Sequence, residues 1–505
     1  MTGISFEDFA QAYDNGRARL VSATLVADLE TPVSAYLKLS AAQAANTFLL
    51  ESVEGGAARG RYSMIGMEPD AIWRAQGEAS EINRDALTRP DAFTPCPGAP
   101  LDALRAFITE SSVEPDAGLP PMAAGVFGYL GYDMVRQMER LAPAKADPIG
   151  VPDAVMIRPT LMVVFDSVRD EMSVVTPVRP QKGVNARAAY EAAQARIERV
   201  VRVLEGPLTH EAPQMEPGAS APSPVSNTPE ARYLDMVEKA KDYIRAGDIF
   251  QVVLSQRFTA PFSLPAFSLF RALRRVNPAP FLCHLDFGGF QIVCSSPEIL
   301  VRVREGKVTI RPIAGTRWRG KTPAEDEALA AELLADPKER AEHLMLLDLG
   351  RNDVGRVAEI GTVEVTDKFF IERYSHVMHI VSNVEGRLSS KHDNIDALSA
   401  GFPAGTVSGA PKVRAMEIID ELETDKRGIY GGCIGYFGAQ GEMDTCIVLR
   451  TAVIKDGKMH AQAGAGIVYD SDPASEHREC VNKAKALFRA AEEAVRFATG
   501  GKRGQ

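Results

Sequence analysis

The sequence has few cysteines and no long apolar run, and each absence argues against a class of protein. Six cysteines are scattered over 505 residues without a CxxC pair, so we expect neither a zinc cluster nor a disulfide framework. Apolar runs such as Leu161–Phe165 are too short to cross a bilayer and are typical of buried strands. The first ten residues lack the basic and apolar regions of a signal peptide. We therefore expect a soluble, cytoplasmic protein without membrane contact.

A surplus of positive charge is also missing. The 57 Lys and Arg residues stand against 67 Asp and Glu residues, which gives a formal net charge of −10. Nucleic-acid binders carry a basic face, so we expect no nucleic-acid partner. An anionic small molecule is not excluded, because the field inside one site can differ from the net charge.

The length predicts two or three domains, and composition marks one boundary. Residues 206–228 are rich in proline, serine and alanine and carry little apolar periodicity, which is typical of a linker. A helix is expected just before them, at Asn185–Leu204. We therefore predict an N-terminal region at 1–205 and a second domain at 229–505.

The second domain is expected to begin with a helix. Thr228 can cap this helix, Pro229 suits its first turn, and Gly247 can end it. Short strands with hairpin-like spacing follow, with helices between them. The expected strands are Ile249–Phe258, Ile292–Cys294, Ile299–Val303, Val308–Ile310, Gly432–Phe437, Thr445–Val453 and Met459–Val468, and the expected helices are Pro323–Leu334, Lys338–Leu347, Pro411–Leu422 and Ser475–Ala494. This order favours an α+β fold built on large antiparallel sheets.

Two ExxE steps could form a metal site. Glu339 and Glu342 share one face of an expected helix, and Glu476 and Glu479 share a face of another. If the two faces meet, four carboxylates offer hard oxygen ligands that suit Mg²⁺. Solvated helix surface is the alternative that spacing alone leaves open.

Three glycine-rich turns could hold an anion. They are Ala314–Thr316, Phe402–Lys412 and Gln462–Val468. Glycines let backbone amides approach a ligand closely, and Pro411 stands where a helix is expected to start. Tight turns between strands are the plain alternative.

Three single residues are candidates for chemistry. Glu298 follows Pro297 at an expected strand end and could be a general acid. His379 lies in a strand-like stretch, where a structural role is also open. Arg450 ends the run CIVLR, where it would need an anionic partner if buried and would otherwise be a surface residue. The residues alone indicate an enzyme, rich in acids and glycines, that acts on an anion with Mg²⁺.

Taken together, these segments resemble the chorismate-utilising enzymes, most closely the component I branch of the anthranilate synthases. The match covers nearly all of residues 228–494, and a weaker one covers LLES and GRYSMIG in the N-terminal region. The resemblance implies an α+β sandwich of large antiparallel sheets flanked by helices, with the active site in a cleft. The segments that carry it are GDIFQVVLSQRF, SSPE, RPIAGTRWRG, ERAEHLMLLDLGRND, HVMHIVSNVEG, FPAGTVSGAPKVRAMEIID, YGGCIGY, DTCIVLR and QAGAGIV.

The resemblance also implies roles for single residues. Glu298 corresponds to the acid that helps the ring hydroxyl leave, and His379 to the histidine linked to pyruvate elimination and aromatisation. The implied metal residues are Glu342 and Glu479 as Mg²⁺ ligands, with Glu339 and Glu476 as water-mediated partners. The implied chorismate contacts are Gly315, Thr316, Tyr430, Arg450, Gly464, Ala465 and Gly466.

Two positions bear on which reaction the family member performs. Ala314 stands where aminodeoxychorismate synthases typically have lysine, and Gln251 where isochorismate and salicylate synthases have a lysine base. Alanine cannot act as a nucleophile and glutamine cannot activate water, whereas ammonia needs less activation. The implied reaction turns chorismate and ammonia, through aminodeoxyisochorismate, into anthranilate and pyruvate. An aminodeoxychorismate or aminodeoxyisochorismate synthase and a catalytically silent, tryptophan-binding subunit are the alternatives.

The family takes ammonia from a glutaminase, and this sequence shows no nucleophilic cysteine with a His-x-Glu partner. A separate glutaminase subunit is therefore expected, in a heterotetramer, together with feedback control by L-tryptophan of this first committed step of tryptophan synthesis. Leu50 belongs to the matching inhibitor motif LLES, but NPAPFLC replaces the usual NPSPYM, so Ala279 also differs. The expected inhibitor residues are Glu51, Ser52, Pro280, Phe281 and Leu282.

Overall fold

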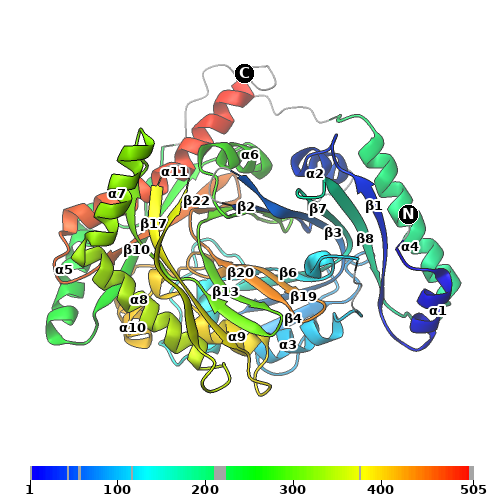
Figure 1. Cartoon of the computed structure of the whole chain (residues 1–505), viewed down its shortest axis with the longest axis horizontal. Coiled ribbons are helices and arrows are strands. Elements are labelled where there is room, and N and C mark those ends of the chain that lie inside the picture. Colours follow the sequence, from blue (N-terminus) through cyan, green and yellow to red (C-terminus); the bar gives the residue numbers. More distant parts are fainter. Residues whose placement is uncertain are drawn as a thin grey trace.

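The structure is a computed structural model, and it describes residues 3–41, 45–54, 58–114, 118–209, 223–374 and 377–499 (Figure 1). The middle of the predicted linker, residues 210–222, lies outside the described residues. No helix in the described ranges is long and apolar enough to cross a membrane.

Helices are interspersed among runs of consecutive strands in the described residues. The α-helices are α1 (Phe6–Asp14), α2 (Pro32–Ser40), α3 (Pro100–Glu110), α4 (Ala186–Glu205), α5 (Glu230–Ala246), α6 (Ala266–Val276), α7 (Pro323–Ala335), α8 (Pro337–Gly355), α9 (Asn394–Gly401), α10 (Lys412–Leu422) and α11 (Pro473–Thr499). Short 3₁₀ helices occupy Pro121–Ala123, Tyr132–Gln137 and Gly405–Val407. The strands before residue 230 are β1 (Arg19–Val26), β2 (Thr47–Glu54), β3 (Ala58–Gln76), β4 (Ala79–Asn83), β5 (Thr94–Pro95), β6 (Gly125–Leu130), β7 (Ala154–Asp166), β8 (Glu171–Val178) and β9 (Val225–Ser226). The later strands are β10 (Gln251–Pro261), β11 (Phe281–Asp286), β12 (Gln291–Ser296), β13 (Ile299–Arg304), β14 (Lys307–Ile310), β15 (Ile313–Trp318), β16 (Glu364–Arg373), β17 (Val377–Arg387), β18 (Gly409–Ala410), β19 (Cys433–Gly438), β20 (Met443–Ile447), β21 (Thr451–Lys455) and β22 (Lys458–Ile467).

The strands form two antiparallel branches that face each other. One branch runs β3–β2–β11–β12–β21–β22–β10, and the other runs β7–β6–β19–β20–β13–β14–β17. The branches start from β3 and β7, which pair with each other. The expected α+β fold with large antiparallel sheets is confirmed.

Apolar side chains fill the space between the branches and cover their outer faces. One buried cluster joins Ile292 of the first branch to Ile434 of the second. A second cluster packs α4, α6 and α11 on the outside of the first branch, and a third packs α3 and α9 on the second. The layers form a sandwich of sheets flanked by helices. This architecture arises because each sheet must bury at least one apolar face against another layer.

The regions before and after residues 206–228 share their sheets. Phe281 pairs with Ser52 where β11 meets β2, and Cys433 pairs with Leu130 where β19 meets β6. The predicted boundary therefore separates two stretches of sequence whose strands pair side by side.

Most expected elements of the second half are present, with two differences. Helix α5 ends at Gly247 as expected, but its N-cap is Pro229 and no side chain caps it, so the expected Thr228 cap is wrong. The expected strand Thr445–Val453 is two strands, β20 and β21, because the backbone turns at Arg450 with φ of 49°. That turn removes Arg450 from both ladders and leaves its side chain available to a site.

Candidate active site

Glu298 lies between β12 and β13 with its carboxyl group buried. The hydroxyl of Thr406 donates to its two carboxylate oxygens over 3.3 and 3.2 Å. Burial raises the pKa of Glu298 to about 8, against the opposing effects of the Thr406 hydrogen bond and the Arg450 charge. At neutral pH the carboxyl group therefore keeps its proton, as a general acid must.

His379, on β17, is a buried and neutral imidazole. Its Nδ1 lies 2.8 Å from the carbonyl oxygen of Gly315 and 3.1 Å from the hydroxyl of Thr316. A carbonyl only accepts, so Nδ1 carries the hydrogen and the lone pair stands on Nε2. Burial lowers the pKa of His379 to about 4, which keeps Nε2 free to take a proton at neutral pH.

Gly315 can hold that carbonyl in place only because it lacks a side chain. Its φ is 67°, a left-handed value that favours glycine. A Cβ there would also lie 3.1 Å from Oε2 of Glu339. The segment Ala314–Thr316 is not the expected turn but part of strand β15, at a register shift in its pairing with β17. It links the imidazole of His379 to the acidic helix α8.

Arg450 supplies a half-buried positive charge. Among the described residues, no carboxylate lies within 4.0 Å of its guanidinium. Tyr374 and Glu298 interact with the guanidinium electrostatically, without a hydrogen bond. Burial lowers its pKa from the ordinary value for arginine, yet the side chain stays a cation at neutral pH. A half-buried cation without a counter-ion among the described residues is suited to an anionic ligand.

Glu298, His379 and Arg450 belong to one site. The charge of Arg450 acts on both other groups, lowering the pKa of each. Tyr374 adds an edge-on ring contact to His379, with ring centroids 5.4 Å apart. The structure therefore brings together an acid, a base and an anion-binding cation that lie up to 152 residues apart in sequence.

The predicted acids lie on α8 and α11, where Glu339 pairs with Arg317 over 3.3 Å and the exposed Glu479 pairs with Lys483 over 2.8 Å. Burial, followed by the charges of Glu339 and Glu479, raises the pKa of Glu342. Burial and the charge of Glu479 likewise raise the pKa of Glu476. The two helix faces are thus close enough for their carboxylates to repel one another. We find no three of these carboxylates in the described residues with ligand oxygens all within 4.8 Å of one another.

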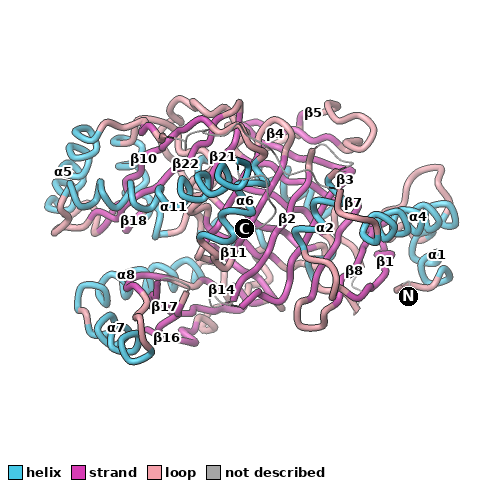
Figure 2. Tube along the Cα trace, turned by 90° about the horizontal axis from the view of Figure 1, so that it is seen from above, coloured by secondary structure: helices cyan, strands magenta, loops and turns pink. Residues whose placement is uncertain are grey.

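Strands β10 and β22 form a second wall beside the acids (Figure 2). Nε2 of Gln251 donates to Oε1 of Glu342 over 3.2 Å, while the buried Oε1 of Gln251 has no hydrogen-bond partner. A Cβ on Gly466 would lie 2.5 Å from that Nε2, and one on Gly464 would lie 2.9 Å from the hydroxyl of Tyr430. The expected turn at Gln462–Val468 is wrong, because Gly464–Gly466 lie within strand β22 and Ala465 pairs with Leu254 of β10. The two glycines of this strand let polar side chains approach the backbone closely.

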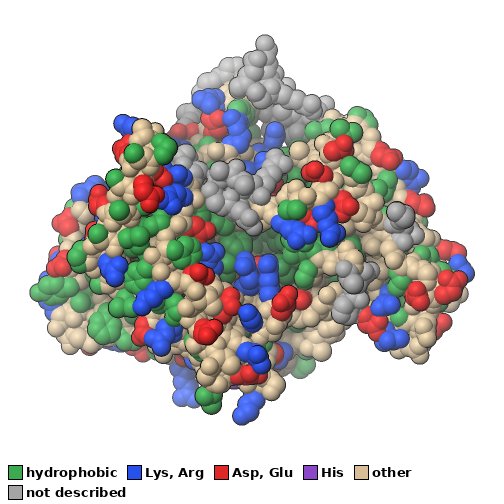
Figure 3. All heavy atoms as spheres, viewed as in Figure 1, with side chains coloured by type: hydrophobic (Ala, Val, Ile, Leu, Met, Phe, Trp, Pro, Cys, Tyr) green, Lys and Arg blue, Asp and Glu red, His purple; other side chains and the backbone are tan. Residues whose placement is uncertain are grey.

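Four of the five expected inhibitor residues line a cavity of about 600 Å³ between the branches. They are Glu51, Ser52, Pro280 and Phe281, and the molecule is hollowed on this face with Lys or Arg side chains at the opening (Figure 3). Leu282 is not at the cavity, because side chains alternate along β11 and it packs in the core on the opposite face. Arg274 holds Glu51 by two hydrogen bonds of 2.7 and 3.0 Å.

Several residues of these sites were not predicted from the sequence. Thr406 and Tyr374 touch Glu298 and His379 although no spacing marks them, and only the segment FPAGTVSGAPK could have drawn attention to Thr406. The cysteines are a correction: three that are scattered in sequence, Cys283, Cys294 and Cys446, have their sulfurs within 4.8 Å of one another. Contacts between different strands carry no local sequence signal.

The fold and this constellation define a class of protein. The family model described as chorismate binding enzyme matches residues 46–489. The chain belongs to this family of chorismate-binding enzymes, so the expected resemblance is confirmed.

Similar proteins narrow the class. Component 1 of anthranilate synthase from Cereibacter sphaeroides is 58% identical over 98% of this chain and 98% of its own length. The Thermus thermophilus component 1 is 48% identical over 95% of this chain and 99% of its own. The crystal structure of component I from Streptococcus pneumoniae superposes with a TM-score of 0.74 at 39% identity, over 85% of this chain and 92% of that chain. The menaquinone-specific isochorismate synthase of Escherichia coli shares the fold, with a TM-score of 0.71 at 19% identity over 95% and 99%.

Proposed function

We propose that the chain is the chorismate-converting component of an anthranilate synthase. Its relatives that carry this name match it over nearly their whole length, which supports the assignment. The observation that carries it is the site itself: the buried, protonated carboxyl group of Glu298, the buried, neutral imidazole of His379 and the half-buried guanidinium of Arg450 interact electrostatically, and the guanidinium has no counter-ion among the described residues. Those are the groups needed to bind a dianion, expel a hydroxyl and remove a ring proton.

Arg450 and the glycine-rich segments of β15 and β22 bind the substrate. Chorismate carries two carboxylates, and one of them pairs with the guanidinium of Arg450. This guanidinium has no carboxylate partner among the described residues, so it is available to the substrate. Backbone amides at Gly315 and in Gly464–Gly466 are the further expected contacts. These anchors place the ring between Glu298 and His379.

The acids on α8 and α11 fit Mg²⁺. Mg²⁺ in proteins is usually held by one or two carboxylates with waters and substrate oxygens, so a closed cage of three is not required. Glu342 and Glu479 would hold the ion, with Glu339 and Glu476 bound through water, because their mutual repulsion is relieved by a divalent cation. When bound, the ion would polarise the substrate carboxylate and lower the barrier to losing the ring hydroxyl.

Glu298 performs the first step as general acid. Ammonia adds to C2 of the ring while the hydroxyl at C4 leaves with the proton of Glu298, which yields water and aminodeoxyisochorismate. The added nitrogen then gives up a proton, so the charge balances and Glu298 can be protonated again. The raised pKa of Glu298 provides the proton at neutral pH.

His379 performs the second step as general base. Its Nε2 takes the proton from C2 while the C3–O bond breaks, and the ring becomes aromatic. The enolpyruvyl group leaves as the enolate of pyruvate, which takes up a proton on its methylene carbon to give pyruvate, and the imidazolium returns its proton to solvent. The Nδ1 hydrogen bond to Gly315 keeps the imidazole in the tautomer that this step needs. Burial keeps it neutral and therefore basic.

Ammonia rather than water is the nucleophile that the site suits. The amide of Gln251 has no basic lone pair to activate water, but its unpaired Oε1 can accept a hydrogen bond from ammonia. Ala314 removes the nucleophilic lysine that an aminodeoxychorismate synthase would use. Both residues favour anthranilate as the product.

Regulation and assembly follow from the same assignment. The ammonia comes from a separate glutaminase subunit, in a cytoplasmic hetero-oligomer that we expect to be a heterotetramer. L-tryptophan binds in the cavity of Glu51, Ser52, Pro280 and Phe281 and inhibits the enzyme. Phe281 lacks the hydroxyl of the usual tyrosine, a contact worth on the order of 1 kcal/mol.

Growth of two bacterial auxotrophs tests the proposal. One strain lacks its own component 1 and needs tryptophan, and the other lacks aminodeoxychorismate synthase and needs p-aminobenzoate. We expect the chain to restore growth of the first strain on high ammonium and not of the second, and Glu298→Gln to restore neither. Rescue of the second strain alone, or of neither strain while the wild-type chain accumulates in folded form, would contradict the proposal.

A further inference from the structure

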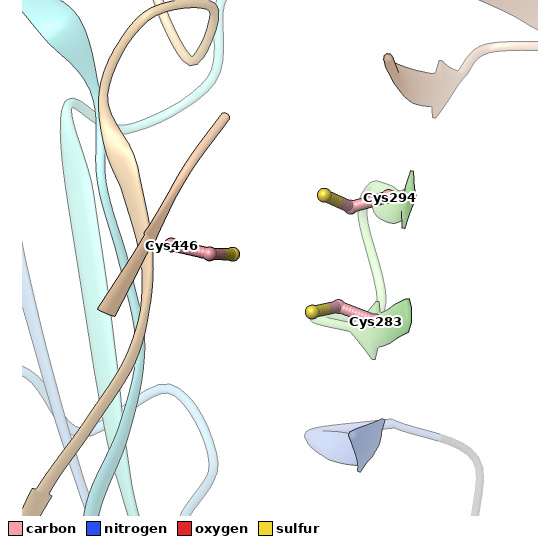
Figure 4. Close-up of side chains that lie close together, drawn as sticks. All are labelled: Cys283, Cys294 and Cys446. Atoms are coloured by element: carbon pink, nitrogen blue, oxygen red, sulfur yellow. The ribbon is translucent and has the colours of Figure 1, made fainter. Parts of the chain in front are cut away.

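Three buried cysteines meet where the two sheet branches face each other. Cys283 lies on β11, Cys294 on β12 and Cys446 on β20, and their sulfur atoms are all within 4.8 Å of one another. Figure 4 shows the side chains of Cys283 and Cys294 pointing toward Cys446, which approaches from the opposite strand. The cluster therefore spans the sandwich.

The backbone fixes this arrangement. Cys283 and Cys294 are direct partners in the β11–β12 ladder, so their side chains leave the same face of the sheet. Cys446 is held in β20, where Ile299 of β13 is its partner. Three sulfurs around one ion at about 2.3 Å each would be about 4 Å apart, so binding requires shifts of less than 1 Å or so.

All three potential metal ligands in the cluster are cysteine sulfurs. In the described ranges, no histidine or carboxylate joins the three sulfurs in a group of this size. The Cys294 thiol donates weakly to the carbonyl oxygen of Leu449 over 3.7 Å, and all three cysteines belong to a buried cluster of apolar side chains. Thiolates select soft cations such as Zn²⁺ and Cu⁺ over the hard Mg²⁺ that the glutamates suit.

The cluster also has an entry path. Cys283 and Cys446 line the cavity of about 600 Å³, together with Phe281 and Glu51. An ion can therefore reach the sulfurs from solvent and keep an open coordination position toward the cavity.

We propose that Cys283, Cys294 and Cys446 form a binding site for one soft, thiophilic metal ion that ties the two sheet branches together beside the cavity. Binding replaces the thiol protons with three metal–sulfur bonds, so it releases protons and strengthens as the pH rises. No change of oxidation state is involved. The site is separate from the glutamates of α8 and α11 and does not depend on the proposed reaction.

Cadmium titration of the full chain tests this site. The Cys96→Ser chain is the reference, because Cys96 is the partly exposed cysteine. We expect one Cd²⁺ per chain with thiolate-to-metal absorption in the ultraviolet, proton release, a higher midpoint of thermal unfolding, and displacement by Zn²⁺. Adding Cys446→Ala to the reference chain should weaken Cd²⁺ binding by more than roughly 10- to 100-fold. That is the usual effect of replacing a residue that only supports a metal ligand without touching the metal. Cys433→Ala, which removes a buried cysteine outside the cluster, should leave binding unchanged.

Two results would overturn the proposal. One is the absence of thiolate absorption in the reference chain. The other is equal binding by the reference and Cys446→Ala chains. If Cys446→Ala does not fold, Cys294→Ser replaces it in the comparison, since serine keeps the shape of the site and removes a soft ligand. Weaker binding by Cys294→Ser than by the reference chain would support the proposal, and equal binding would overturn it.

Discussion

The Nδ1 of His379 donates a hydrogen bond to the carbonyl oxygen of Gly315 over 2.8 Å, across 64 residues of sequence. This bond determines which imidazole nitrogen is basic, because the donor nitrogen cannot also accept a proton. It depends on a glycine with φ of 67°, so a backbone conformation sets the tautomer of the base.

Replacing His379 should separate the two chemical steps. In His379→Gln, we expect chorismate still to be consumed while aminodeoxyisochorismate accumulates, because Glu298 and Arg450 are intact. Anthranilate formation should fall by about 10²- to 10⁴-fold, the usual contribution of a general base. Chromatography of the products over time measures both. His460→Asn, which removes a histidine bonded to Thr259 instead, is the control and should behave as wild type. Unchanged anthranilate formation by His379→Gln would remove His379 from the mechanism.

Glu298→Gln should lose activity and gain stability. Burial raises the pKa of Glu298 from 4.5 to about 8, so between these values the folded state binds a proton that the unfolded state has released. Stability contributed at this position is therefore full below pH 4.5 and falls as the pH rises toward 8. Glutamine does not titrate, so the variant should unfold at a higher temperature than wild type, and increasingly so from pH 5 to 8. Its turnover should drop about 10²- to 10⁴-fold.

Thermal unfolding and turnover, each measured across this pH range, check the Glu298 prediction. At constant free ammonia, wild-type turnover should decline above about pH 8 as the acid loses its proton. Lower stability of Glu298→Gln at pH 7 would contradict a buried, protonated carboxyl group.

Removing Glu342 should abolish the response to Mg²⁺. Glu342→Gln keeps the size of the side chain and its contact with Gln251, but it removes one of the two expected metal ligands. We expect Mg²⁺-dependent activity to be lost with little change in the unfolding temperature, whereas Glu492→Gln on α11 should keep the wild-type response. Activity plotted against Mg²⁺ concentration checks this. A wild-type Mg²⁺ curve for Glu342→Gln would assign the metal elsewhere.

The cavity wall should set the response to tryptophan. Phe281→Ala removes an aromatic side chain from the cavity and should weaken tryptophan inhibition about fivefold, since one aromatic contact is worth on the order of 1 kcal/mol. Leu282→Met is the matched control, because Leu282 packs in the core on the other face of β11. Inhibition curves and tryptophan-induced stabilisation measure the effect. If millimolar tryptophan changes neither property of the wild-type chain, the cavity is not an inhibitor site.

Local patterns predicted the parts of the site that lie within one element. The ExxE spacing predicts that Glu339 and Glu342 share one helix face, and the glycine at 315 marks a backbone irregularity, although it lies within strand β15 and not in a turn. The break at Arg450 could not be predicted, because CIVLR continues the β-pattern of its neighbours and the positive φ is imposed by tertiary contacts. Leu282 was assigned from a motif, although alternation along a strand would have placed it opposite Phe281.

Long-range contacts explain the remaining differences. Thr406 reaches Glu298 over 108 residues, and the cysteine cluster joins three strands from two branches. Such contacts depend on strand register across the whole sandwich. A single sequence contains that information only through a family resemblance.

The product formed by the purified chain from chorismate, Mg²⁺ and isotopically labelled ammonium tests the central claim most directly. We predict fluorescent anthranilate that carries the label on the ring carbon next to the carboxyl-bearing carbon, together with one pyruvate per anthranilate. Label at the carbon opposite the carboxyl group, or an unlabelled hydroxylated product, would contradict the account.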